Sequence, residues 1–438
     1  REVLYEQMPE ALRRESHLVA GEALEARCAG QEEERIYDLA HHFVRGRNAE
    51  KGYRYALRAA DRAEAHFAPA EAVAYLDDAL SSLQRLPEEA GRDEERMDLE
   101  HRRGRLLATV GRLEEAIAAL ESALAASRDL GRRDSAMPSQ PPAVDSPRHR
   151  IARREAEILL DLGSVHGRSG AWDRAVALAD ESLRLADALG DGERRASALL
   201  STAFFDFERG DWEAAVGKLQ AALEVAESDG LELLKARILG NMAIMYNARG
   251  DRARAVELYQ GSIETFERLD QPLDVGRGLS NMGFSHFGLG AHDRAEACYR
   301  RALELFEKLG DVREQGLVYL HLAEVALARE TLDEARGHCT QAMRRFSRLG
   351  FELGMADVDR IYAGIARREG RWAVAERYLR EALAVYDDYG DQLNLAETHE
   401  ELSALLEEGG QAQEAAEELE RSRIIYHTLS GTLDPADA

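Results

Sequence analysis

Residues 271–310 read QPLDVGRGLSNMGFSHFGLGAHDRAEACYRRALELFEKLG, and the pattern in this stretch decides the fold. Gly290 divides the stretch into two halves, and Gly310 ends the second half. Apolar residues recur at spacings of three and four within each half, which indicates one amphipathic helix per half. A glycine after each half supplies the left-handed residue that ends a helix without a steric penalty. The stretch therefore predicts two helices of ~15 residues joined by a tight turn.

The same pattern recurs with a 40-residue period along most of the chain. We call the glycine-like position between the two halves the repeat mark, and the helices before and after it the first and second helix. The repeat marks are Gly170, Gly210, Gly250, Gly290, Glu330, Gly370 and Gly410. Small residues occupy positions −7, +5 and +12 relative to each mark, as Gly283, Ala295 and Ala302 do around Gly290. A larger side chain there would hold two helices apart, so we expect helix contacts at these places.

These small residues, with apolar or aromatic residues such as Met282, Tyr299 and Phe306 between them, resemble the tetratricopeptide repeat (TPR). The resemblance covers roughly residues 92–429, including an earlier repeat around Gly111. The common repeat has about 34 residues, and a longer repeat is similar to the variety found in bacterial signalling proteins and cytoplasmic peptide receptors. The resemblance implies an all-α fold, a right-handed superhelical solenoid of stacked antiparallel helix pairs whose first helices line a concave groove. Stacking is also expected because one helix pair cannot bury its apolar face alone.

Two further features of the repeats predict local structure. Aspartate directly follows several of the turn glycines, where its carboxylate can accept a hydrogen bond from the start of the next helix. The predicted caps are Asp191, Asp211, Asp251, Asp311 and Asp391. The tryptophans Trp172, Trp212 and Trp372 all stand at position +2 relative to a mark, which indicates packing at the turn.

The first ninety residues are helical in pattern but do not follow the 40-residue spacing. A helix is expected from about Asn48 to His66, between turns at residues 46–48 and 68–69. Residues 1–14 (REVLYEQMPEALRR), 39–43 (LAHHF) and 50–60 (EKGYRYALRAA) resemble the passage from the winged-helix end of a STAND-type signalling ATPase into its TPR sensor. This resemblance implies that an ATPase, and any kinase module, lies in a part of a longer protein upstream of Arg1.

The chain is therefore expected to contain six segments. They are a helical junction (1–45), an irregular TPR-like lead-in (46–90), one TPR unit (91–131), a flexible proline-rich insertion (132–150), seven 40-residue TPR units (151–430) and a tail (431–438). The insertion holds four of the nine prolines.

Composition and charge exclude several classes of function. The formal net charge of −25 disfavours nucleic acid and anionic membrane surfaces as partners. No apolar run approaches ~18 residues, so no membrane span is expected. Cys28, Cys298 and Cys339 lie far apart, which fits a reducing compartment and gives no disulfide framework. We expect a cytoplasmic protein that binds no cofactor.

No motif of a nucleotide-binding, hydrolase or kinase site occurs in the sequence. Asp38, His41 and His42 come nearest to a metal cluster. On a helix, however, Asp38 and His42 share a face while His41 is turned about 100° away. We therefore expect structural histidines, no metal site and no catalysis by this chain.

A stripe of side chains at positions −13, −9, −6 and −2 relative to each mark is, by the resemblance, the groove side of the first helices. Two successive repeats carry arginine, asparagine and an apolar residue there: Arg237, Asn241 and Ile244, then Arg277, Asn281 and Phe284. Arginine donates to carboxylates, and an asparagine amide both donates to and accepts from a peptide backbone. The neighbouring repeats add Ser201, Phe204 and His321. These nine residues are the predicted peptide-binding site; the alternative is that they only link adjacent helices or face solvent.

The sequence thus favours a protein- or peptide-binding scaffold, the sensor arm of a larger bacterial signal-transduction protein that holds its ligand in the concave groove. An ATPase or kinase module of the full-length protein would receive the signal. Two alternatives stay open: a free-standing cytoplasmic quorum-type peptide receptor, and a scaffold for self-association.

Overall fold

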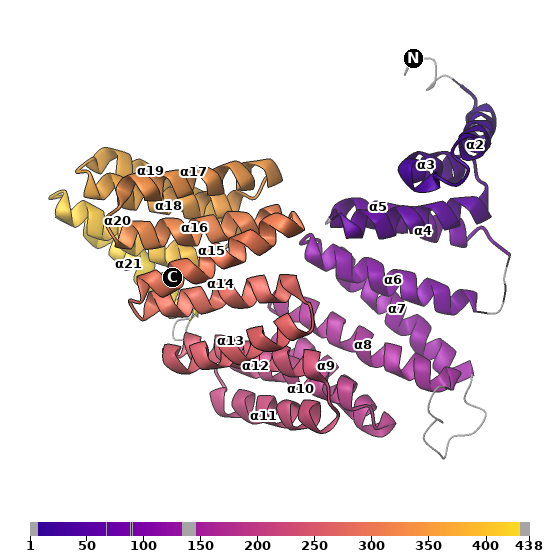
Figure 1. Ribbon diagram of the computed structural model, residues 1–438, viewed down its shortest axis with the longest axis horizontal. Helices are drawn as coiled ribbons and strands as arrows, with labels where there is room; N and C mark the ends of the chain where they lie inside the picture. The colour runs from indigo at the N-terminus through magenta and orange to yellow at the C-terminus, as the bar shows by residue number, and fades with distance from the viewer. Residues whose placement is uncertain (1–7, 67, 88, 90, 134–145, 430–438) are drawn as a thin grey trace. The chain divides into compact units, whose positions relative to one another are not determined.

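The computed structural model describes residues 8–66, 68–87, 89, 91–133 and 146–429. In these ranges the regular structure is entirely helical, with antiparallel neighbours packed in pairs, which confirms the all-α solenoid (Figure 1). The chain divides into two compact units, residues 1–234 and 235–438. In the described ranges, no helix combines the length and the apolar character that a membrane span requires.

The helices of the first unit follow one another in chain order. They are α2(Glu10–Arg27), the short 3₁₀ helix η1(Glu32–Arg35), α3(Ile36–Arg45), α4(Ala49–Ala65), α5(Pro69–Leu83), α6(Arg92–Thr109), α7(Leu113–Arg133), α8(Pro147–Arg168), α9(Trp172–Leu189), α10(Gly192–Glu208) and α11(Trp212–Ser228). The helix expected near residues 48–66 is α4, and the Asn48 side chain caps it by accepting from Lys51 N at 3.0 Å.

The second unit continues the same alternation. Its helices are α12(Glu232–Ala248), α13(Arg252–Arg268), α14(Pro272–Gly288), α15(His292–Leu309), α16(Val312–Ala328), α17(Leu332–Leu349), α18(Glu352–Arg368), α19(Trp372–Tyr389), α20(Gln392–Glu408) and α21(Ala412–Leu429). The boundary between the units falls within α12. Even-numbered helices from α6 onward are first helices, and odd-numbered helices are second helices.

The turns lie where the repeat spacing predicts them. Every repeat mark has a positive φ, and six of the seven are glycine. The exception is Glu330, with φ 62°, and Asp270 at a turn halfway between marks has φ 52°. The turn therefore requires the left-handed backbone whatever residue stands there, and a residue with a Cβ adopts it at a cost.

The predicted aspartate caps are confirmed. Each of the five carboxylates accepts a hydrogen bond from the backbone N–H three positions later, at 3.1–3.2 Å. Two of the tryptophans pack at the turns as expected, Trp172 against Phe205 and Trp212 against Phe207. Trp372 is 41% exposed, so packing does not account for its whole side chain.

Small residues form the contact between the two helices of a repeat. Ala295 and Ala302 are fully buried, and a Cβ added to Gly283 would stand 2.7 Å from Tyr299 Cε1. The same holds in the first unit, where a Cβ on Gly104 would lie 2.6 Å from Leu120 Cγ. These distances are shorter than carbon atoms tolerate, so the two backbones approach closely only because the residues are small.

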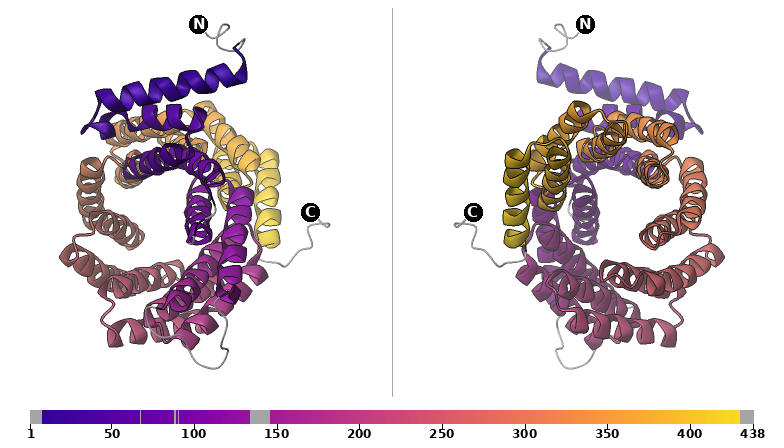
Figure 2. Two further views of the ribbon diagram at one scale, coloured as in Figure 1. Left: turned by 90° about the vertical axis from the view of Figure 1, so that its right-hand side faces the viewer. Right: turned by 90° about the vertical axis from the view of Figure 1, so that its left-hand side faces the viewer.

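The first helices lie on the inner side of each unit. α6 contacts α8 and α8 contacts α10 in the first unit, while α14 contacts α16 and α16 contacts α18 in the second. Helices on the inner side of a curved stack are drawn together, which explains these contacts. Figure 2 shows the pairs of the second unit following one another round a curve from orange to yellow.

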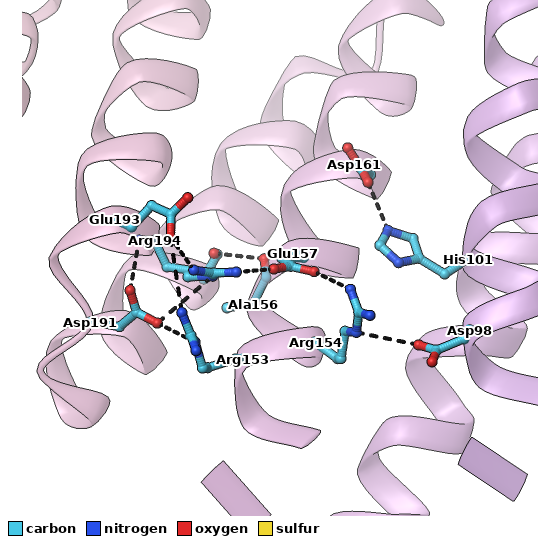
Figure 3. Close-up of polar contacts among 11 residues, drawn as sticks. Asp98, His101, Arg153, Arg154, Ala156, Glu157, Asp161, Asp191, Glu193 and Arg194 are labelled. Carbon is cyan, nitrogen blue, oxygen red and sulfur yellow. Dashed lines mark hydrogen bonds and ion pairs between the residues drawn. The ribbon is translucent and has the colours of Figure 1, made fainter. Parts of the chain in front are cut away.

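Ion pairs join successive first helices at a fixed place in the repeat. One partner stands at position −13 relative to its own mark, and the other stands at position −16 relative to the next mark. The pairs that follow this rule are Asp98 with Arg154 at 3.3 Å, Glu157 with Arg194, and Arg277 with Glu314 at 3.2 Å. In Figure 3 Arg154 also reaches Glu157, so α6, α8 and α10 are linked by one continuous network. Each pair thus links two neighbouring first helices at the same place in the repeat.

The proline-rich insertion lies largely outside the described residues, as do the tail and the first seven residues. Its described flanks belong to helices, since α7 extends to Arg133 and α8 begins at Pro147. Arg153 and Arg154 in the second flank pair with acidic side chains of neighbouring helices.

We expect Glu330→Gly to stabilise the protein by about 1 kcal/mol, because glycine removes the Cβ that makes the left-handed turn unfavourable. The matched control is the opposite change at an equivalent mark, Gly290→Glu, which should destabilise by a similar amount. Urea unfolding followed by far-UV circular dichroism measures both. Equal midpoints for Glu330→Gly and the wild type would contradict this account of the turn.

We expect Arg277→Glu and Glu314→Arg each to lower the free energy of unfolding by about 0.5–1 kcal/mol, since each change places like charges across the α14–α16 contact. The double variant restores the opposite charges and should recover most of the loss. Denaturation of the four proteins at low and high salt measures the coupling. Additive losses in the double variant would show that the pair does not stabilise this contact.

Candidate peptide-binding face

The predicted stripe lies on the first helices, and its apolar members are exposed. Ile244 on α12 is 43% exposed and Phe284 on α14 is 46% exposed. Phe204 on α10 of the first unit is similarly exposed at 45%, and Ser201 nearby is half-buried. Large apolar side chains in these positions on the inner helices provide contact area for a ligand.

The polar members of the stripe are partly used within the protein. Arg277 Nε donates to Glu314 Oε1 on the next first helix, and Asn241 Nδ2 donates to the carbonyl of Arg237 one turn earlier. Arg237 and Asn281 are exposed. The arginine–asparagine pattern therefore includes at least one residue, Arg277, that has a structural partner.

His321 is held in place between two aromatic rings. Its imidazole stacks on Tyr299 with ring centroids 5.2 Å apart, and the Phe284 ring lies 6.4 Å away. His321 Nδ1 is also 3.1 Å from Glu324 Oε2. The exposed face of α14 is thus continuous with α16 through Phe284, His321 and Glu324.

Beyond Glu324 the second unit opens into a pocket with a volume of ≈ 580 Å³. It is bounded mainly by first helices α16, α18 and α20, with α19 beneath them. Its apolar lining residues include Leu320, Leu327, Ile361, Leu379 and Leu405. Its charged lining residues are Glu324, Asp357, Arg360, Arg367, Arg368, Glu397 and Glu401. Apolar and charged side chains thus line one cavity, a combination that ligand sites use to hold and orient a ligand.

Arg360 organises the charged side of this pocket. Its guanidinium donates to Asn394 Oδ1 at 3.0 Å, Glu397 Oε2 at 3.1 Å and Glu401 Oε1 at 2.6 Å. Burial opposes the charge, but the hydrogen bond and charge of Glu401 outweigh it and raise the pKa of Arg360 above its usual value. Among the described residues no acceptor reaches its buried Nε. Arg360 therefore keeps one unsatisfied donor, which is uncommon because buried donors are normally satisfied.

Asp357 lies on the same helix, one turn before Arg360. Burial raises the pKa of its carboxyl, and the hydrogen bond donated by the Tyr386 hydroxyl at 2.6 Å opposes that rise. Three glutamates of α20, Glu397, Glu401 and Glu408, pair with arginines of α18. Arg367 pairs with Glu408 in the same way as Arg360 pairs with Glu401.

A change at one place in the repeat explains where the pocket opens. At position −6 relative to the mark, α12 and α14 carry Ile244 and Phe284, whereas α18 carries Gly364. A Cβ on Gly364 would stand 2.9 Å from Leu327 Cδ2, at the pocket wall. Neither Gly364 nor Arg360 is among the site residues predicted from the sequence. The change from a bulky residue to glycine at position −6 is the sequence feature that could have indicated the pocket.

The residues that come nearest to a metal cluster in the sequence, Asp38, His41 and His42, are not the trio that the structure brings together. Asp38 Oδ2 accepts from Arg35 at 3.1 Å, while the ring of His17 on α2 lies against His41 and His42. Burial, and then the charge of Arg45, lower the pKa of His41 to about 4. The His41 ring is therefore neutral at pH 7.

The fold is similar to several solved structures of low sequence identity. A Rap protein complexed with Competence and Sporulation Factor has a TM-score of 0.58 at 12% identity, with 87% of this chain and 100% of that chain covered. The Rap conjugation gene regulator of plasmid pLS20, in complex with the Phr* peptide, has a TM-score of 0.54 at 13% identity, with 83% and 92% covered. The STAND protein with a TPR sensor from Pyrococcus horikoshii has a TM-score of 0.50 at 14% identity; 82% of this chain matches 52% of that protein.

No curated protein matches the sequence. Two family models described as tetratricopeptide repeat do match it, one over residues 195–268, 234–308 and 354–426 and the other over residues 101–138. Together they cover just over half of the chain, and they fall on the helix pairs described above. The chain belongs to the tetratricopeptide-repeat family.

Proposed function

We propose that this protein binds an extended peptide, or an extended segment of a partner protein, along the first helices of its second unit. The observation that carries this proposal is the pocket of ≈ 580 Å³ beside Gly364, which combines apolar walls with a buried arginine donor. The complex with the Phr* peptide named for one fold neighbour supports the proposal by analogy only, because a shared fold does not fix a function.

An extended peptide would use two kinds of contact on this face. An apolar side chain would enter the pocket between Leu327 and Ile361, and a backbone carbonyl would accept a hydrogen bond from Arg360 Nε. Further along the bound peptide, apolar side chains of the peptide would pack on Phe284 and Ile244. The amides of Asn281 and Asn241 would form hydrogen bonds with the peptide backbone. Since Arg277 is paired with Glu314, we assign it to the support of this face.

The larger role that we propose is that of a sensor arm in a bacterial signal-transduction protein. Two likenesses support this: the N-terminal segment of this chain resembles the junction between a STAND ATPase and its TPR sensor, and a STAND protein with such a sensor has a similar fold. In this scheme the chain itself performs no catalysis. The peptide would act by favouring one curvature of the helix stack over another. A free-standing peptide receptor would use the same face but would need its own output module.

We expect Gly364→Phe to weaken peptide binding about tenfold or more, because the new side chain displaces Leu327 from the pocket wall and occupies the pocket. The probe is a displayed library of random linear peptides selected on the wild-type protein, followed by dissociation constants for the enriched sequences. Gly337→Phe is the matched control: Gly337 lies on the second helix α17, is exposed, and its added Cβ would contact nothing within 4 Å. This variant should bind as the wild type does.

Circular dichroism of both glycine variants establishes that the helices persist. Enriched peptides that bind Gly364→Phe with unchanged affinity would remove the pocket from the proposal. A selection that enriches no peptide above background would overturn the proposed function itself.

A further inference from the structure

Three histidines of the first unit converge where α2 packs against α3. The ring centroids of His17, His41 and His42 are 5.2–5.3 Å apart in every pair, so the rings form a nearly equilateral triangle. His17 Nδ1 lies 3.0 Å from His42 Nδ1, and one nitrogen of each ring lies within 4.8 Å of the other two. The proposed peptide-binding face does not include these residues.

Two glycines position the helices that carry the rings. A Cβ on Gly21 of α2 would stand 3.2 Å from His42 Cβ, and a Cβ on Gly46 would stand 2.8 Å from Leu18 N. The absence of both side chains lets α2 approach α3 closely, so that His17 reaches between His41 and His42. On α3 alone, Asp38 and His42 share a face and His41 is turned away, so these three cannot form a metal cluster. The structure instead adds a third ring, His17, from another helix.

The spacing of the nitrogen atoms suits a tetrahedral metal ion. Imidazole nitrogens bind zinc at about 2.0–2.1 Å, so two of them on one tetrahedral ion are about 3.3 Å apart. The 3.0 Å between His17 Nδ1 and His42 Nδ1, which is a hydrogen bond between the two rings, is close to this value, and the three ligand nitrogens lie within 4.8 Å of one another. To bind one ion the rings must turn, and the ring that donates this hydrogen bond must carry its proton on its other nitrogen. We propose that His17, His41 and His42 bind one zinc ion through one ring nitrogen each and leave a fourth position open to water.

Arg45 opposes this binding and provides the sharpest test of it. Its Nη1 lies 2.8 Å from His41 Nδ1, so the guanidinium occupies one possible ligand atom and repels a cation. Arg45 is exposed, and its side chain can move into solvent when an ion binds. If the cluster were only a packed group of rings, Arg45 would have no influence on zinc affinity.

The experiment uses the whole chain, without a histidine tag and after treatment with a chelator. Zinc alone is titrated by calorimetry, and Co²⁺ is used as a spectroscopic probe because tetrahedral cobalt absorbs strongly in the visible range. We expect one ion per chain and a zinc-dependent rise in melting temperature, since an ion that binds only the folded state stabilises it. His17→Gln should weaken zinc binding about tenfold or more.

Two further variants keep the test independent of folding. Arg45→Gln leaves all three rings in place and should tighten zinc binding about threefold or more. His66→Gln is the control, because His66 lies in the same unit with its Nδ1 against the Arg62 carbonyl and outside the cluster. The absence of stoichiometric binding by the wild type would overturn the proposal. Equal affinities of the wild type and Arg45→Gln, or of the wild type and His17→Gln, would also overturn it.

Discussion

The close approach of two helices within each repeat is the constraint on which the rest of the structure depends. Where Gly283 faces Tyr299 and where Ala295 is fully buried, there is no room for another carbon atom. Because every repeat keeps small residues at these places, the two helices of every pair can approach closely. Pairs of equal shape can stack only by repeating one rotation, and that repetition brings the first helices together on one side. The face that carries the pocket is a product of this packing.

The repetitive part of the fold was predictable because its signals are local. A left-handed turn needs a glycine, an aspartate cap bonds three positions ahead, and a helix contact needs a small residue; each is visible within one repeat. The contacts that define the sites are not local. Arg360 bonds to residues 34–41 positions later, and His17 meets His42 across 25 positions. Their partners depend on how two helices cross, which periodicity does not specify. For the same reason the sequence presents Arg277 as a ligand group, whereas in the structure its guanidinium donates to Glu314.

The candidate site also shows how one scaffold acquires a particular surface. Position −6 relative to each mark lies on a first helix, and its residue differs from repeat to repeat: Phe204, Ile244 and Phe284 are exposed, whereas Gly364 lies close to Leu327. Ile244 and Phe284 make the face apolar and raised, whereas Gly364 leaves a hollow. The hollow is stable because Arg360 and its carboxylate partners are mutually neutralised, which limits the cost of holding charge at a partly buried surface. One place in the repeat can thus carry a bulky apolar residue, as at Phe284, or no side chain, as at Gly364, on the same scaffold.

The ion pairs between first helices differ in which partner comes first along the chain, the acid or the base. In the first unit the acid precedes the base, as Glu157 does Arg194, and in the second unit the base precedes the acid, as Arg277 does Glu314. Repeated genes readily gain and lose copies by recombination. A deletion that placed the repeat containing α16 directly after the repeat containing α8 would bring Glu157 opposite Glu314. Two acidic side chains would then face each other where an ion pair now stands. The ion pairs thus depend on the order of the repeats. Some rearranged orders would place like charges at a junction and lose stability there, although the shapes of the helix pairs would still allow them to stack.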